Sequence, residues 1–159
     1  MVKQSIDAKA YLNRIRLMDK KIDAMQDQLE WLKTTILRIT PTLKEDVVSG
    51  GGSQDKLGDT MAKICDLKEE INREIDILVD ERSHTIRLMN QMKTPEYFEI
   101  LYKRYMEYKT YEEIAAEMHY GREWACRLHG RALQEFKRIL EEFDGNRKEV
   151  TESHTIPVL

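Results

Sequence analysis

The sequence is poor in the residues that break helices. Its 159 residues include three prolines and seven glycines, whereas glutamate, lysine, leucine, isoleucine and methionine are abundant. These abundant residues favour helix, and glycine and proline favour it least. No stretch of useful length alternates apolar and polar residues as a half-buried strand does. The sequence therefore predicts an all-α protein.

Cysteine and long apolar runs are scarce as well. The two cysteines, Cys65 and Cys126, lie far apart without paired spacing, which suits a reducing cytoplasm better than secretion. The N-terminus lacks the apolar core of a signal peptide, and no segment approaches the length of a membrane span. We therefore expect a soluble, cytoplasmic protein.

An excess of positive charge is also missing from the chain as a whole. The formal net charge is −3, whereas a protein that binds nucleic acid mainly through charge is usually basic. The balance reverses over residues 119–138, which hold five lysines and arginines and two glutamates. If the chain binds nucleic acid, the contact is therefore expected at residues 119–138, where the positive charge is concentrated.

A first long helix is predicted from about Asp7 to Ile39. Thr40-Pro41 is expected to end it, because proline disfavours helical geometry in the residue before it. The apolar residues recur in alternating steps of three and four, as in a coiled-coil-type helix. They are Tyr11, Ile15, Met18, Ile22, Met25, Leu29, Leu32, Ile36 and Ile39.

A second long helix is predicted after residues 42–54, which contain three consecutive glycines and are expected to form a flexible connector. Ser53 or Asp55 is the expected N-cap, and the helix continues to about Lys93. Two such helices predict an antiparallel hairpin over residues 1–93. Because each helix buries only one side, we favour self-association as a dimer, in a four-helix bundle, over a monomer packed on the C-terminal domain.

Residues 94–143 are predicted to form a three-helix domain. Thr94-Pro95 is a common helix opening, with threonine as N-cap and proline at the first helical position, and this helix extends to Tyr108. Thr110 and Glu113 have the spacing of a capping box for the next helix.

A turn at His119–Gly121 precedes the last predicted helix, Arg122–Phe143, for which Gly121 is an acceptable N-cap. Asp144-Gly145 is expected to end this helix and leave residues 144–159 as a disordered tail. A short capped helix, a three-residue turn and a longer helix form the pattern of a helix-turn-helix, whose second helix enters the DNA major groove.

At 100° per residue the last helix divides into two faces. The expected core face comprises Ala125, Leu128, Ala132, Phe136 and Ile139. On and beside the opposite face, the candidates for base readout are Arg122, Glu123 and Arg127. The candidates for contacts to the DNA backbone or flanking groups are Thr110, Tyr111, Tyr120, Trp124, Gly130, Arg131 and Arg138.

Several candidates also have a structural interpretation. Arg122 opposes the helix dipole, so we favour a contact to guanine or phosphate over a surface ion pair with Glu117 or Glu123. Glu123 suits a hydrogen bond from cytosine and an i,i+4 pair with Arg127 equally well. For Trp124, packing is favoured over a contact to a thymine methyl group or a sugar.

Tyr111 and Tyr120 suit phosphate contacts, with core or surface packing as an equal alternative. Gly130 costs a helix interior about 1 kcal/mol relative to alanine, which indicates close approach of another backbone or a phosphate. Cys126, His129 and His119 form only part of a metal-ligand pattern, so no metal or other cofactor is expected. No catalytic combination of side chains stands out, and we expect a protein that is not an enzyme.

The segment 110–136 resembles the C-terminal promoter-binding region, region 4, of bacterial sigma factors. The resemblance implies that Arg122, Glu123 and Arg127 read the −35 promoter element. The direct matches are Thr110, Glu112-Glu113-Ile114-Ala115, Arg122-Glu123 and Arg131-Ala132-Leu133, with conservative matches at Met118, Leu128 and Phe136. Gly121, Trp124 and Cys126 depart from the pattern, which implies that a different DNA sequence is read.

The stretch from about Ala10 to Leu140 also resembles Gram-positive phage and prophage regulators, grouped with the RinA/ArpU-type late-gene activators. This resemblance rests on KKIDAMQDQLEWL, SGGGSQDKLGDT, EEINREIDILVD and the sigma-like C-terminal part. It implies sequence-specific promoter binding and activation of late phage genes in a bacterial host. Region 4 alone lacks the domain that melts the −10 element, which implies an activator rather than a complete sigma factor.

These features together predict an all-α transcriptional regulator that binds double-stranded promoter DNA, with host RNA polymerase as a possible partner. Two other interpretations remain. One is a protein-interaction module that binds RNA polymerase without specific DNA contacts, which the acidic total charge suits. The other is a phage assembly protein built on the hairpin, with the helix-turn-helix as incidental packing.

Overall fold

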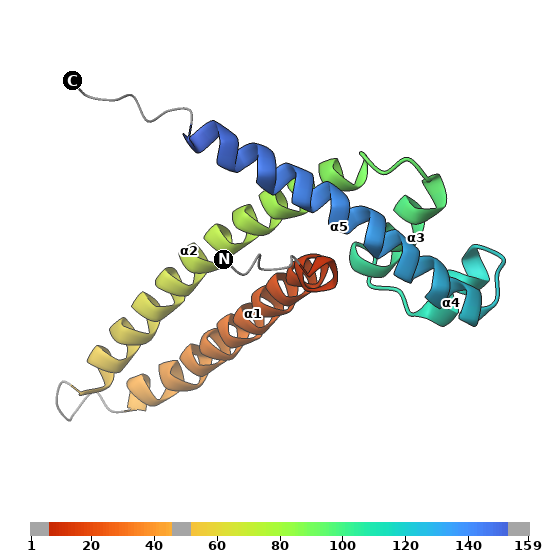
Figure 1. Cartoon of the computed structure of the whole chain (residues 1–159). Helices are drawn as coiled ribbons and strands as arrows, with labels where there is room; N and C mark the ends of the chain where they lie inside the picture. The colour runs from red at the N-terminus through yellow and green to blue at the C-terminus, as the bar shows by residue number, and fades with distance from the viewer. Residues whose placement is uncertain (1–6, 46–51, 153–159) are drawn as a thin grey trace, which may run out of the picture. The chain divides into compact units, whose positions relative to one another are not determined.

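A computed structural model of the chain describes residues 7–45 and 52–152, and within them every regular element is a helix (Figure 1). This confirms the predicted all-α class. The helices are α1 (Ala8–Glu45), α2 (Gly52–Met89), α3 (Pro95–Tyr105), α4 (Tyr111–Glu117) and α5 (Arg122–Glu152). None of the described helices has the length and apolarity needed to cross a membrane.

The described chain divides into two compact units, each of which we describe by itself. One unit is Leu17–Asp80, which holds most of α1 and α2. The other, called here the C-terminal unit, combines the described residues up to Arg16 with those from Glu81 onward. The C-terminal unit therefore contains α3, α4 and α5 together with the first turns of α1 and the last turns of α2.

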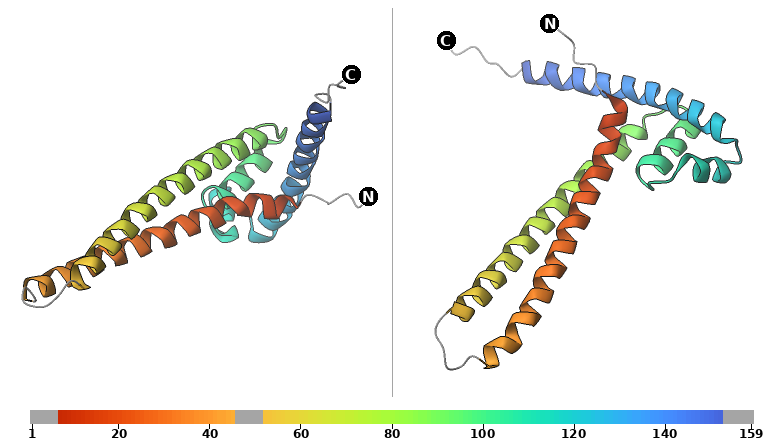
Figure 2. Two further views of the ribbon diagram at one scale, coloured as in Figure 1. Left: turned by 90° about the vertical axis from the view of Figure 1, so that its left-hand side faces the viewer. Right: turned by 90° about the horizontal axis from the view of Figure 1, so that it is seen from below.

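Within Leu17–Asp80, α1 and α2 run side by side in opposite directions, as Figures 1 and 2 show. The apolar stripe predicted for the first helix supplies the buried side chains Ile22 and Leu32, and α2 supplies the buried side chains Ile64 and Ile71. Lys21 Nζ donates to Glu74 Oε1 at 2.7 Å and links the two helices. The predicted antiparallel hairpin is confirmed.

The predicted helix ends around the connector are wrong. The helix α1 continues through Pro41 to Glu45. A proline inside a helix removes one hydrogen bond and crowds the carbonyl oxygen four residues earlier, but its fixed φ angle is helical, so the helix is weakened there without having to end. The helix α2 begins at Gly52, so Ser53 and Asp55 lie in its first turn rather than at the N-cap. An aspartate there is stabilised by the helix dipole. Of the predicted flexible connector, residues 46–51 lie outside the described part of the chain.

Three further helix ends differ from prediction. The helix α5 passes Gly145 and ends at Glu152, because one glycine weakens a helix by about 1 kcal/mol without stopping it. Of the predicted tail, residues 153–159 lie outside the described chain. The helix α2 ends at Met89 in tight turns, with Met92 N donating to Met89 O at 3.0 Å. The helix α3 ends at Tyr105, three residues before Tyr108, whose φ of 59° is not helical.

The core of the C-terminal unit is built from all five helices. The fully or almost fully buried side chains are Leu12 and Ile15 of α1, Leu88 and Met89 of α2, Ile100 and Leu101 of α3, Ile114 of α4 and Phe136 of α5. The rings of Tyr11 and Phe136 lie 6.0 Å apart. Arg82 of α2 donates from Nη1 to Met106 O at 3.1 Å and so binds the end of α3.

Candidate nucleic-acid interface

The helix α4 starts with the predicted capping box. Glu113 N donates to Thr110 Oγ1 at 3.2 Å, and Thr110 N donates to Glu113 Oε2 at 2.7 Å. The Thr110 hydroxyl also donates to Glu113 Oε2 at 3.0 Å, and the two hydrogen bonds from the Thr110 N–H and hydroxyl lower the pKa of the Glu113 carboxyl. The capping box therefore satisfies two otherwise free N–H groups and defines where α4 begins. At α3, Thr94 is the N-cap and Pro95 the first helical residue, as predicted, but the Thr94 side chain makes no capping hydrogen bond.

Four residues, Met118 to Gly121, connect α4 to α5, one more than the predicted turn. Tyr120 N donates to Ala115 O at 2.8 Å and folds the turn back on α4. His119 adopts the left-handed conformation with φ 59°, a conformation that costs a side chain free energy. Gly121 directly precedes Arg122 and accepts from Ala125 N at 3.0 Å, which confirms its predicted N-cap position.

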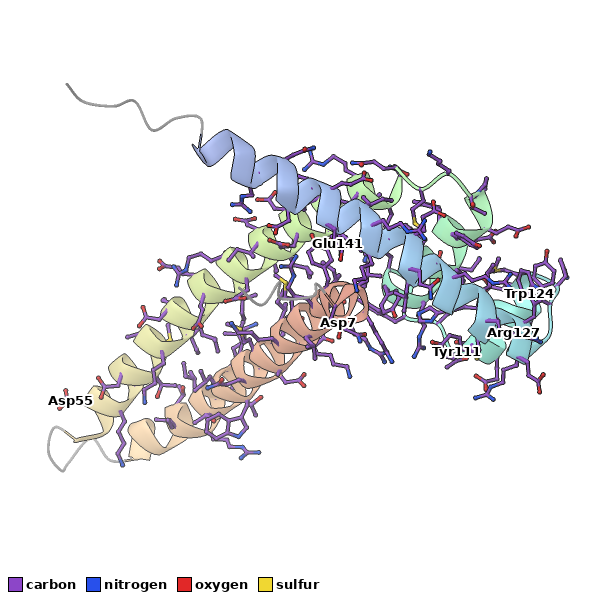
Figure 3. The ribbon with its side chains drawn as sticks, viewed as in Figure 1. Asp7, Asp55, Tyr111, Trp124, Arg127 and Glu141 are labelled. Carbon is purple, nitrogen blue, oxygen red and sulfur yellow. The ribbon has the colours of Figure 1, made fainter. Side chains whose placement is uncertain are left out.

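The helix α5 has the two predicted faces. All five residues of the expected core face, Ala125, Leu128, Ala132, Phe136 and Ile139, are buried. The opposite face is exposed and carries Glu123, Arg127, Gly130, Arg131, Gln134 and Arg138. Arg127 and Trp124 mark the start of this helix in Figure 3. The positive charge concentrated in the sequence therefore lies at the surface.

Arg122 forms an ion pair, but with neither of the predicted partners. Its Nε lies 2.5 Å from Glu112 Oε1, whereas the carboxylate of Glu117 is held by Lys103 Nζ at 2.7 Å and by Lys109 Nζ at 2.8 Å. A backbone hydrogen bond, and next the Arg122 guanidinium, lower the pKa of Glu112. Both partners of the Arg122–Glu112 pair are more than half exposed, so this pair adds little stability.

Arg127 does not pair with the Glu123 carboxylate among the described residues. Its Nε instead donates to the Glu123 backbone oxygen at 3.4 Å. Both side chains are exposed. Of the two interpretations of Glu123, the i,i+4 ion pair is therefore not formed here, and the Glu123 carboxylate is accessible to solvent on the basic face.

The two aromatic candidates at the start of α5 lie against each other. The rings of Tyr120 and Trp124 stack with centroids 3.6 Å apart. Trp124 is half-buried, in line with the favoured packing interpretation, whereas 42% of Tyr120 is exposed. The pair borders the exposed face of α5 and presents an apolar edge beside Arg127.

Tyr111 and His129 form a buried polar contact that the sequence analysis missed. The Tyr111 hydroxyl lies 3.1 Å from His129 Nδ1, and the Tyr105 hydroxyl lies 2.8 Å from His129 Nε2. Burial raises the pKa of both tyrosines. The sequence feature that points to this contact is the position of His129, next to Leu128 and on the core side of α5. A polar ring in the core requires hydrogen-bond partners.

His129 therefore has tyrosine hydroxyls at both ring nitrogens. The described residues include no group of three or more histidine, cysteine or carboxylate side chains placed to hold a metal ion. His119 is exposed and Cys126 is half-buried. The partial metal-ligand pattern is thus explained, at His129, by hydrogen bonding within the protein.

Gly130 lies in open space. A Cβ atom built on it meets no heavy atom within 4 Å in the described structure, apart from the adjacent backbone of α5 itself. Within the described residues, no other segment therefore approaches Gly130 closely enough to require a glycine. Contact of a phosphate with this position stays a prediction.

The helices α4 and α5, joined by a tight turn and supported by α3, define a helix-turn-helix domain with an exposed basic face on its second helix. Residues 94–138 match the family model of sigma-70, region 4. The match covers α3, α4 and the first half of α5, and it supports the predicted likeness to a DNA-binding region of transcription proteins. Searches of curated proteins and of solved structures gave no match.

Proposed function

We propose that this protein is a sequence-specific regulator of transcription that binds double-stranded DNA through α5. The exposed basic face of α5, within the segment that matches sigma-70 region 4, is the observation that carries the proposal. A helix of this kind fits the major groove, where side chains distinguish all four base pairs. Buried residues on the opposite face of α5 hold it against the rest of the domain.

In this proposal Arg122, Glu123 and Arg127 contact base edges. Arg122 exchanges its exposed partner Glu112 for guanine or a phosphate. Breaking the Arg122–Glu112 pair costs little free energy, because a surface ion pair is weak. Contacts to the DNA backbone and flanking groups come from the remaining candidates Thr110, Tyr111, Tyr120, Trp124, Gly130, Arg131 and Arg138. The partial exposure of the Tyr111 ring lets its hydroxyl serve both His129 and an external group.

We further propose that the protein activates late phage genes together with RNA polymerase in the cytoplasm of a bacterial host. The resemblance to RinA/ArpU-type regulators supports this role, and the region 4 match supports both partners, promoter DNA and polymerase.

The hairpin is proposed to join two copies of the chain into a dimer. Within Leu17–Asp80 it exposes six large apolar side chains on more than one side, and a second copy packed against one side would cover part of them. The six side chains are Leu17, Trp31, Leu37, Met61, Ile77 and Val79. A dimer would present two α5 helices to half-sites about 34–36 Å apart or a multiple of that distance.

Arg127→Ala is expected to weaken binding to a selected site about tenfold and to relax specificity at one base pair. A bidentate arginine contact favours the correct base over a wrong one by about that factor. The site is first selected from random duplex DNA with the full chain. Affinities are then measured for this site, for its single-base variants and for a scrambled duplex at one fixed salt concentration.

Arg73→Ala is the matched control, because Arg73 is an exposed arginine of α2 outside the C-terminal unit. It removes the same charge and should leave the specificity unchanged. If Arg127→Ala retains both native affinity and native selectivity, the role assigned to Arg127 is wrong. If the full chain selects no sequence and protects no DNA from nuclease, the proposed function itself is wrong.

Gly130→Ala is expected to raise the free energy of unfolding by about 1 kcal/mol while weakening binding to the selected site. Alanine is more favourable than glycine inside a helix by that amount, and the new methyl group meets open space in the free protein. On DNA, the same methyl group would separate α5 from the phosphate backbone. Chemical denaturation and binding titration measure the two effects.

Gly58→Ala provides the comparison, because Gly58 also lies in open space, within α2. It should raise stability similarly without changing DNA affinity. Native affinity in Gly130→Ala, together with the gain in stability, would show that no DNA group approaches this position.

A further inference from the structure

The buried ring of His129 connects the three helices of the helix-turn-helix domain. His129 lies on α5 with 5% of its surface exposed. Its Nε2 lies 2.8 Å from the hydroxyl of Tyr105, the last residue of α3, and its Nδ1 lies 3.1 Å from the hydroxyl of Tyr111, the first residue of α4. One side chain therefore joins the end of α3 and the start of α4 to α5.

The burial of the two tyrosines determines which ring nitrogen carries the proton. A neutral imidazole has one N–H donor and one acceptor. Tyr105 is 3% exposed, and among the described residues the His129 ring is the hydrogen-bond partner of its hydroxyl. Its O–H must therefore donate to Nε2, since a buried hydroxyl proton without a partner is costly.

The proton of His129 then resides on Nδ1 and is donated to the Tyr111 hydroxyl. Tyr111 is only half-buried, so its own O–H can point to water. Every donor and acceptor of the ring is satisfied in this arrangement. The other tautomer would direct Nε2–H at the Tyr105 hydroxyl and leave the hydroxyl proton of Tyr105 in an apolar environment.

The charged groups around the ring are positive. Arg104 and Lys9 are the groups whose charges act on His129, and the Arg104 guanidinium lies 4.7 Å from the centre of the Tyr111 ring. Arg104 is itself fixed by donating from Nη1 to Lys109 O at 2.8 Å. Burial first, and then these two cations, lower the pKa of His129 to about 4. The ring is therefore neutral at physiological pH.

We propose that His129, as the neutral Nδ1–H tautomer, is a positioning residue that sets the rotation of α5 about its axis and thereby the direction in which Arg127 points. The apolar contacts on the core face of α5 are not directional, whereas two hydrogen bonds to one planar ring allow a single orientation. The consequence for DNA selectivity rests on the proposed function, but the tautomer and the orientation of α5 do not.

The tautomer is measured directly by nitrogen-15 NMR of the histidine rings in the native full chain near pH 7. The expected spectrum of His129 shows a protonated Nδ1 and an unprotonated Nε2 that couples to the ring protons. Assignment of the resonance uses the Tyr105→Phe variant, which perturbs Nε2. A protonated Nε2 in the native protein would overturn the proposal, whether or not the chain binds DNA.

The positioning role is tested with His129→Phe combined with Tyr105→Phe. This pair removes both members of one buried hydrogen bond, so the loss of stability should be small compared with that of either single variant, which leaves an unpaired polar group. In the double variant the amide resonances of the exposed face of α5 should broaden or shift. Its preference for the selected duplex over a scrambled duplex should fall about tenfold.

Tyr102→Phe is the control, because it removes a tyrosine hydroxyl from the same helix, at a half-buried position. It should leave the α5 resonances and the preference for the selected duplex unchanged. If the double variant keeps the native α5 spectrum, the network is only structural and the proposal is wrong. An altered α5 spectrum in a chain that selects no DNA would support the positioning role and reject the proposed function.

Discussion

Leu12→Ala is expected to destabilise the C-terminal unit by about 2–5 kcal/mol, although Leu12 lies far from the helix-turn-helix in sequence. The Leu12 side chain is completely buried in that unit, and its truncation removes apolar contacts and leaves a cavity. The measurement is urea denaturation followed by the fluorescence of Trp124. Trp31→Phe serves as the background, because Trp31 is the other of the two tryptophans and is 63% exposed.

Gln28→Ala is the control for Leu12→Ala. Gln28 is an exposed residue of the same helix and is not among the apolar side chains proposed to lie in the dimer, so its truncation should change stability by less than about 0.5 kcal/mol. If residues 94–143 folded independently of α1, the Trp124 transition would occur at the same urea concentration in Leu12→Ala as in the native background.

Acidification from pH 6.5 to pH 5 is expected to lower the free energy of unfolding by about 2 kcal/mol through His129 alone. The folded ring has its pKa lowered to about 4, whereas an unfolded histidine binds a proton near pH 6.5. In this interval the unfolded chain binds more protons than the folded one, so the free energy of unfolding decreases as the pH is lowered. The loss ceases below about pH 4, where both forms are protonated.

The stability measurement compares native protein with the His129→Phe, Tyr105→Phe double variant across that interval. The double variant should lose the His129 contribution to the pH dependence, whereas His119→Gln, at an exposed histidine, should retain it. The carboxyls of Glu112, Glu113 and Glu117, whose pKa values are lowered by their hydrogen bonds, are present in both proteins, so the comparison cancels their contribution. An equal pH dependence in native protein and double variant would contradict the prediction.

Features that depend on neighbouring residues were predictable from the sequence. The capping box of Thr110 and Glu113 involves four consecutive residues, and hydrogen bonds in both directions confirm it. The core face of α5 follows from the angle between successive residues of a helix. The sigma region 4 resemblance likewise rests on local matches, and the family model confirms it for residues 94–138.

Helix ends were less predictable, because a helix-breaking residue imposes a cost and not a prohibition. Pro41 and Gly145 both lie inside helices in the structure. Each of these two residues lowers the stability of its helix by a limited amount, which favourable contacts along the rest of a long helix can offset. Sequence rules that treat these residues as boundaries therefore place the ends of α1 and α5 too early.

Contacts between distant segments could not be predicted from one sequence. The heptad pattern of α1 includes Ile15, with Leu12 beside the stripe, but it does not identify which helices cover these two side chains. Likewise, nothing in the spacing of Tyr111 and His129 shows a hydrogen bond between them. The DNA contacts of Arg122, Glu123 and Arg127 depend on a partner outside the chain and stay predictions.

The participation of α1 in the C-terminal unit also has a consequence for how the protein folds during synthesis. Tyr11 contacts Phe136, so the first turns of α1 find this partner only after residue 136 has been synthesised. The hairpin residues Leu17–Asp80 have all their local partners much earlier. Contacts between distant segments form slowly, because a long loop must close first. We therefore expect the hairpin to form before the helix-turn-helix becomes fully stable.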